Sequence, residues 1–148
     1  KSRDNARTPM QWSGEENAGF TEGTPWIRVN PNYKEINAAL QVEDEDSVFG
    51  CYRKLIRFRK EYPVFVDGAF RMLLEEDEEL FAYARENEDS RLLVICNFHG
   101  RTVDCPLEEP FGDMKLLISN YQDAAQTTVL RPYEARMYLQ GKGLSADK

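Results

Sequence analysis

The sequence predicts a mainly β protein in which an antiparallel β-sandwich follows a long irregular loop and one α-helix. Three observations predict this fold. Short apolar runs separated by turn-forming residues fill the chain from Val64 onward, which is typical of an antiparallel sandwich. Apolar residues just before them recur at steps of three and four, as on one face of a helix. The first 46 residues form no convincing element of their own, so we expect a loop there.

The loop begins with a charged segment, Ser2–Trp12, in which Arg3 and Arg7 flank Asp4. The segment breaks at Thr8-Pro9, because the residue before a proline is pushed towards extended conformations. Planar guanidinium groups make paired hydrogen bonds to vicinal hydroxyls or to carboxylates, and Asp4 could fix the rotamer of one arginine while the other faces a ligand. The alternative is a solvated cluster of charges without a ligand, since most exposed ion pairs are unspecific.

Aromatic residues are spaced irregularly along the rest of the loop, at Trp12, Phe20, Trp26 and Tyr33. A structureless loop this long inside a compact domain indicates that part of its surroundings is missing. We therefore expect an ordered surface loop that packs on an absent partner. Sugar stacking and loop anchoring are equally good interpretations of Trp12, whereas packing is favoured for Trp26.

A helix is expected at residues 47–62, with Asp46 or Ser47 as its N-cap and Pro63 as its end. Its apolar stripe consists of Val48, Cys51, Tyr52, Leu55, Phe58 and Tyr62.

Seven strands are expected after the helix. Their ranges are Ala69–Leu74, Leu80–Arg85, Leu92–Phe98, Thr102–Cys105, Lys115–Ile118, Thr128–Leu130 and Ala135–Leu139. The run Leu92–Cys96 is apolar at successive positions, which predicts a central strand buried on both faces. Alternation places Phe81 and Tyr83 on one face of their strand and Ala82 and Ala84 on the other.

Composition opposes several kinds of partner. With 19 basic and 26 acidic residues the chain has a net charge of −7, so neither nucleic acid nor an anionic membrane is expected to bind it. The three cysteines, Cys51, Cys96 and Cys105, lack metal-type spacing, and we expect them to be buried free thiols in a reducing, cytoplasmic compartment. No calcium loop of regular spacing occurs, so we expect no metal and no cofactor.

Four motifs follow one another in the N-terminal loop: Arg3-Asp4-Asn5 with Arg7-Thr8-Pro9-Met10-Gln11-Trp12, Asn17-Ala18-Gly19-Phe20, Gly23-Thr24-Pro25-Trp26 and Val29-Asn30-Pro31-Asn32-Tyr33. With these motifs the chain resembles glycoside hydrolase family 13 enzymes of the oligo-1,6-glucosidase type, which include trehalose-6-phosphate hydrolases and isomaltulose synthases. The resemblance covers nearly the whole chain, from Lys1 to about Leu139. Two positions depart from the family pattern: Ser13 replaces a frequent acid, and Gly50 a frequent aromatic residue.

The resemblance implies a domain organisation and site roles. Residues 1–62 would be the end of a truncated catalytic (β/α)8 barrel, with an active-site loop at 1–46 and the last barrel helix at 47–62. Residues 63–140 would be the α-amylase-type C-terminal β-sandwich, and 141–148 a flexible tail. Arg3 resembles the arginine that recognises the non-reducing-end glucose, and Arg7 resembles its neighbour nearer the aglycone; the reverse assignment of the two is the alternative. Asp4 would orient an arginine. The family's catalytic acids lie upstream, so we expect no catalytic residue in this chain and no activity from it alone.

The resemblance further implies that the parent is a retaining α-glucosidase acting on short α-1,6-linked gluco-oligosaccharides. A trehalose-6-phosphate hydrolase or an isomaltulose synthase is the alternative parent. Expected partners are the oligosaccharide, the upstream barrel, and other copies of the chain through exposed Trp12, Phe20 and Trp26. A third alternative is an autonomous carbohydrate-binding or structural sandwich, whose platform would draw on Phe81, Tyr83, Phe98, Tyr121, Tyr133 and Tyr138.

Overall fold

The computed structural model describes residues 3–107, 113–123 and 127–141. The chain divides into two compact units, Lys1–Phe58 and Arg59–Lys148, which are described separately below. The predicted domain boundary after residue 62 remains a prediction. The predicted tail at 141–148 lies outside the described residues except for Gly141, and that residue ends a strand by pairing with Ser90, so the prediction was wrong there.

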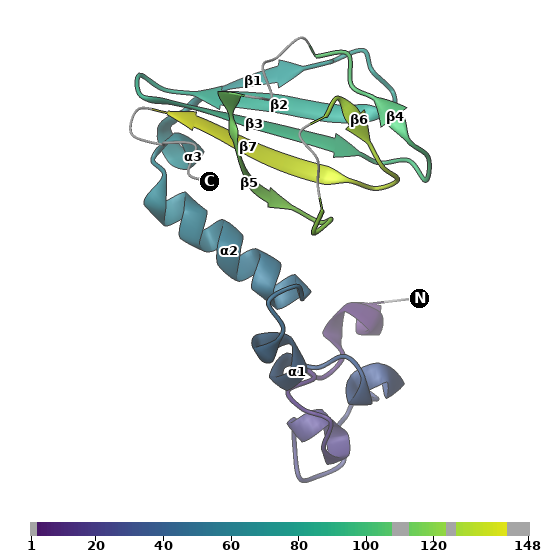
Figure 1. Ribbon diagram of the computed structural model, residues 1–148. Helices are drawn as coiled ribbons and strands as arrows, with labels where there is room; N and C mark the ends of the chain where they lie inside the picture. The colour runs from purple at the N-terminus through teal and green to yellow at the C-terminus, as the bar shows by residue number, and fades with distance from the viewer. Residues whose placement is uncertain (1–2, 108–112, 124–126, 142–148) are drawn as a thin grey trace. The chain divides into compact units, whose positions relative to one another are not determined.

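The described part of the N-terminal unit contains several short helices before α2. They are 3₁₀ turns at Arg3–Arg7, Glu16–Gly19 and Pro31–Lys34, and α1 at Ala38–Glu43 (Figure 1). The expectation that the first 46 residues contain no element was wrong for α1. Asn37 caps this helix, because its side-chain oxygen accepts a hydrogen bond from the backbone N–H of Leu40 at 3.0 Å. Six residues are too few for a helical period to be recognised in the sequence.

The predicted helix is present as α2, Val48–Glu61. Ser47 is its N-cap, since the Ser47 hydroxyl accepts from the N–H of Gly50 at 3.0 Å. Gly50 is buried, and a Cβ atom there would collide with the carbonyl oxygen of Glu45, so a larger side chain does not fit at this position. Cys51 is exposed, so the prediction of a buried thiol was wrong for this cysteine.

The C-terminal unit is the predicted antiparallel sandwich (Figure 1). Its large sheet has the order β1-β2-β3-β7-β5, and β4 pairs with β6 in a small second sheet. All seven predicted strands are present, with ends that differ by at most two residues, and β3 is the central strand as predicted. The strand bounds are β1 Ala69–Leu73, β2 Leu80–Glu86, β3 Ser90–Asn97, β4 Val103–Asp104, β5 Lys115–Ser119, β6 Val129–Leu130 and β7 Ala135–Gly141.

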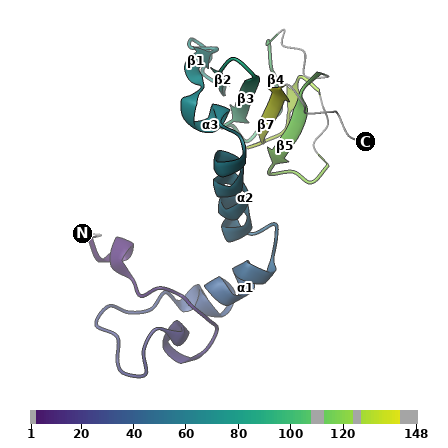
Figure 2. The same ribbon diagram turned by 90° about the vertical axis from the view of Figure 1, so that its left-hand side faces the viewer.

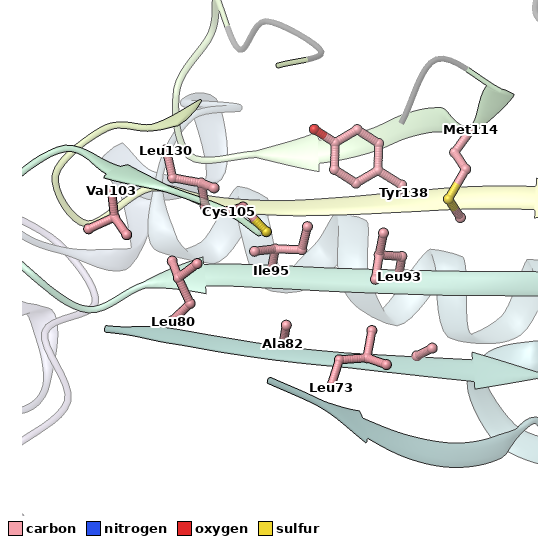
Figure 3. Close-up of a cluster of buried hydrophobic side chains, with 11 residues drawn as sticks. Leu73, Leu80, Ala82, Leu93, Ile95, Val103, Cys105, Met114, Leu130 and Tyr138 are labelled. Carbon is pink, nitrogen blue, oxygen red and sulfur yellow. The ribbon is translucent and has the colours of Figure 1, made fainter. Parts of the chain in front are cut away.

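Apolar side chains cover both faces of the large sheet. On the face towards the small sheet, Leu93, Ile95 and Tyr138 pack with Val103 and Leu130 (Figure 3). On the opposite face, a short helix that the sequence did not predict, α3 at Val64–Asp67, packs on β3 and β7. Figure 2 shows α3 and β4 on opposite sides of the large sheet. Because β3 is covered on both faces, its sequence is apolar without alternation.

A buried ion pair joins the two sheets. Glu134, just before β7, accepts hydrogen bonds from Arg136 Nε and Nη2, each at 2.9 Å. Arg136 in turn donates to the backbone carbonyls of Thr127 and Val129, both at 2.7 Å, and thereby holds the segment that contains β6. Both side chains are buried. Burial raises the pKa of Glu134, but hydrogen bonds from Arg136 and Arg131 outweigh it, and the pKa falls to about 2.

Replacing Glu134 by Ala should therefore destabilise the chain strongly. It leaves the Arg136 guanidinium buried without its partner, a change that costs about 3–5 kcal/mol of unfolding free energy. Urea unfolding measures this loss, and Glu88→Ala, an exposed turn position in the same unit, should stay within about 0.5 kcal/mol of the unmodified chain.

The pH dependence checks the same pair. The folded-state pKa of Glu134 lies below its ordinary value of 4.5. The ionised carboxylate therefore contributes fully to the free energy of unfolding above pH 4.5, and this contribution is lost as the pH falls towards 2. Glu134→Gln should flatten the stability curve in this window. An unchanged curve would contradict an ionised Glu134 in the folded state.

Candidate functional site

The two arginines of the N-terminal segment meet at one hollow. Its volume of about 440 Å³ lies in the usual range for small-ligand sites. The N-terminal unit alone supplies its lining, which consists of Arg3, Asp4, Arg7, Thr8, Pro9, Met10, Phe20, Trp26 and Ile27.

Arg3 and Arg7 lie at the two ends of a 3₁₀ turn. With three residues per turn, side chains four positions apart differ in direction by about 120°, so the two guanidinium groups reach different parts of the hollow. Asp4 Oδ1 lies 3.9 Å from Arg3 Nε, and both side chains are largely exposed. This distance is too long for a hydrogen bond, so Asp4 biases the position of Arg3 only weakly.

A left-handed turn shapes the loop that carries Phe20. Asn17, Ala18 and Gly19 have φ angles of 53°, 60° and 65°. Non-glycine residues in this region are strained, and such strain persists only where the surrounding structure fixes it. Here the carbonyl of buried Ala18 accepts the N–H groups of both Trp12 and Ser13, at 2.9 and 3.0 Å. The turn is thus fastened directly to the segment that follows the arginines.

The Gln11-Trp12 segment is held at the start of α1. The carbonyls of Gln11 and Trp12 accept the N–H groups of Ala38 and Ala39, at 2.8 and 3.0 Å. The Gln11 side-chain amide also donates to Asn32 Oδ1 at 3.1 Å. These bonds satisfy the first free donors of the helix, so Gln11 and the Trp12 backbone have a scaffolding role.

The aromatic residues are arranged differently from what the sequence suggested. Trp26 is fully exposed and lines the hollow together with half-exposed Phe20. The packing favoured for Trp26 is thus not made within the described residues. Trp12 is half exposed but does not line the hollow. The sequence offered Trp12 as the candidate for sugar stacking, whereas the structure places Phe20, which follows the left-handed turn, in the lining with the arginines.

Two features of the described residues bear on the type of site. No cluster of three or more His, Cys, Asp or Glu side chains in that part of the chain is arranged to hold a metal ion. Among the helices of the same residues, none is both long and apolar enough to cross a membrane.

Two family models match the chain in succession. Residues 1–68 match the model described as alpha amylase, catalytic domain, and residues 80–136 match the alpha-amylase SusG C-terminal domain. These matches define the class: part of an α-amylase-type catalytic domain followed by its C-terminal β domain. The chain belongs to the α-amylase family, glycoside hydrolase family 13.

Individual relatives are similar over almost all of the chain. An oligo-1,6-glucosidase from Halalkalibacterium halodurans is 50% identical over 145 residues, which are 94% of this chain and 26% of the relative. The crystal structure of Bacillus licheniformis trehalose-6-phosphate hydrolase is 47% identical, with a TM-score of 0.86 over 96% of this chain and 27% of that one. Isomaltulose synthase from Klebsiella sp. LX3 is 41% identical, with a TM-score of 0.84 over 94% and 26%. The chain thus spans about a quarter of the length of the relatives it matches.

Adding one methyl group to the left-handed turn, at Gly19, should weaken the hydrogen bonds that hold this loop. A Cβ atom at Gly19 would lie 2.6 Å from Ser13 Oγ, and φ there is positive, so Gly19→Ala should cost about 1–2 kcal/mol locally. The amides of Trp12 and Ser13, which donate to Ala18, should then exchange about tenfold faster with solvent deuterons.

Gly23→Ala is the matched control. Its Cβ atom would meet only Thr21 Oγ1, at an ordinary 3.8 Å, and the exchange of the same two amides should be unchanged. Equal effects of the two substitutions would show that the turn does not hold this loop.

Proposed function

We propose that this chain is the C-terminal part of a retaining α-glucosidase that acts on short α-1,6-linked gluco-oligosaccharides. The observation that carries the proposal is the convergence of Arg3 and Arg7 on one hollow, in a chain that is 50% identical to an oligo-1,6-glucosidase. Residues 1–62 then belong to the catalytic barrel, with the loop at 1–46 and the last helix at 47–62, and residues 63–140 form the supporting sandwich. The catalytic carboxylates lie upstream of this chain.

The site residues have distinct roles in this proposal. Arg3 pairs with an upstream acid and donates to hydroxyls of the non-reducing-end glucose, while Arg7 lies nearer the aglycone. Asp4, 3.9 Å from Arg3, has the weaker role of biasing the position of that arginine. Phe20 and Trp26 form the apolar wall of the hollow, which suits the C–H face of a sugar ring. Trp12 anchors the loop through its backbone.

The same loop is compatible with a second substrate class. The solved relatives include a trehalose-6-phosphate hydrolase and an isomaltulose synthase at 47% and 41% identity, so either activity is the alternative for the parent. Assays of the full-length polypeptide with isomaltose, trehalose 6-phosphate and sucrose separate the three. Preferential release of glucose from isomaltose supports the proposal, and a preference for either other substrate replaces it.

Compartment and self-association belong to the same proposal. The free thiols of Cys51, Cys96 and Cys105 support a reducing, cytoplasmic location. In the chain alone, exposed Trp12, Phe20 and Trp26 would bring copies together.

The 148-residue chain alone should hydrolyse no glucoside. It contributes substrate-binding arginines but not the two carboxylates of a retaining mechanism. Release of nitrophenol from nitrophenyl α-glucoside by the purified chain, compared with buffer, is the measurement. Activity that copurifies with the folded chain through two chromatographic steps would overturn the assignment.

Arg3→Ala in the full-length polypeptide should lower kcat/KM for isomaltose roughly a hundredfold, because loss of a charged hydrogen bond costs about 2–3 kcal/mol in the transition state. The loss in kcat/KM should far exceed any effect of the substitution on the melting temperature. Arg28→Ala removes an exposed arginine of the same unit that does not line the hollow, and should leave kcat/KM unchanged. Equal kinetics for both variants would assign Arg3 no part in substrate binding.

A further inference from the structure

Asn17 holds the loop segment that carries both aromatic residues of the hollow. Its backbone carbonyl accepts the N–H of Phe20 at 3.1 Å. Its side-chain NH₂ group donates to the backbone carbonyls of Thr21 and Gly23, at 3.2 and 3.1 Å. Among the described residues, every hydrogen bond that joins residues 20–26 to another part of the chain is made with Asn17. The position of this segment therefore depends on one side chain.

The same asparagine is fixed on its other side. It belongs to the left-handed turn whose Ala18 carbonyl accepts the N–H groups of Trp12 and Ser13. These two residues lie shortly after residues 7–10, which line the hollow. Asn17 thus connects the part of the loop that carries the arginines to the part that carries the aromatic rings.

The contacts of Asn17 make both a backbone and a side-chain demand. Its φ angle of 53° lies in a region that asparagine and glycine enter more readily than other residues do. Both side-chain partners are carbonyl oxygens, so the side chain has to supply two N–H donors, as a carboxamide does. Ionised aspartate tolerates the same φ but has no donor, and glycine has no side chain. Asparagine meets both demands together.

We propose that Asn17 is a positioning residue that holds Phe20 and Trp26 in place. The two rings then form a preformed wall for the sugar ring whose hydroxyls the arginines bind; this inference rests on the proposed function, in which the hollow receives the substrate. Asn17 itself does not line the hollow, so it acts on the substrate only through this wall. A wall that must first be ordered lowers the affinity for the sugar, because ordering side chains on binding costs free energy.

Kinetics of the full-length polypeptide test the proposal. Asn17→Gly removes the amide but tolerates the positive φ, so the turn itself is kept. KM for isomaltose should rise about fivefold while kcat stays within about twofold, because the wall contacts the sugar alike in the ground state and the transition state. Asn17→Asp keeps the size of the side chain but turns a carboxylate towards two carbonyl oxygens, so KM should rise at least as much.

Asn30→Gly is the matched control. It removes an asparagine of the same unit whose side chain also makes a hydrogen bond, from the N–H of Asn32 at 3.4 Å. Asn30 neither lines the hollow nor bonds to residues 20–26, so KM should not change.

A double-mutant cycle shows whether Asn17 acts through the wall. In a variant that carries Phe20→Ala and Trp26→Ala, adding Asn17→Gly should change KM by less than about 1.5-fold, since no wall is left to position. A merely structural role would change the kinetics by the same factor in both backgrounds, and that result would overturn the proposal.

Other results would overturn the proposal as well: an unchanged KM in Asn17→Gly, a fall in kcat without a rise in KM, or an Asn17→Asp variant that behaves like the unmodified polypeptide. Faster hydrogen exchange at the amides of Trp12 and Ser13 in Asn17→Gly would show that the side chain holds the turn instead of the wall. A preference of the full-length polypeptide for trehalose 6-phosphate or sucrose would refute the proposed function alone. The same comparison of KM values, made with that substrate, then decides the role of Asn17.

Discussion

The C-terminal unit depends on the buried ion pair of Glu134 and Arg136. The large sheet and the two short strands β4 and β6 share an apolar core, but β4 and β6 pair over only two residues each. Such a short ladder is weak by itself. Arg136 compensates by donating to the carbonyls of Thr127 and Val129, and Glu134 neutralises the charge that this arrangement buries. The cost of desolvating both groups makes the pair a strict geometric constraint, since neither charge is tolerated there alone.

The N-terminal unit is stabilised mainly by backbone hydrogen bonds, because it has little apolar core of its own. Its shape comes from backbone groups that satisfy one another: the Ala18 carbonyl with two amides, and the Gln11 and Trp12 carbonyls with the start of α1. These bonds leave the arginines and Trp26 at the surface of one hollow. A binding loop built in this way keeps its side chains available for a ligand, since they are not needed to hold the fold.

The large sheet carries an apolar cluster on each of its two faces. One face is closed by β4 and β6, and the other is closed in part by α3. On this second face the rings of Phe81, Tyr83 and Phe98 meet edge to face, and Phe98 stays largely exposed. The sandwich therefore has one closed face and one face that α3 covers only in part.

The sequence by itself determined the strands, α2 and the arginine motif, because each is encoded by neighbouring residues: short apolar runs between turns, a helical period of about four turns with Asp46 or Ser47 as cap, and a contiguous string from Arg3 to Trp12. It did not reveal α1 or α3, which are too short to show a period. Only the tertiary structure decided that Glu134 is buried, that Trp26 rather than Trp12 lines the hollow, and that Phe70 and Phe98 contact aromatic rings of β2. Each of these depends on contacts between residues distant in the chain, and local sequence patterns carry no information about such contacts.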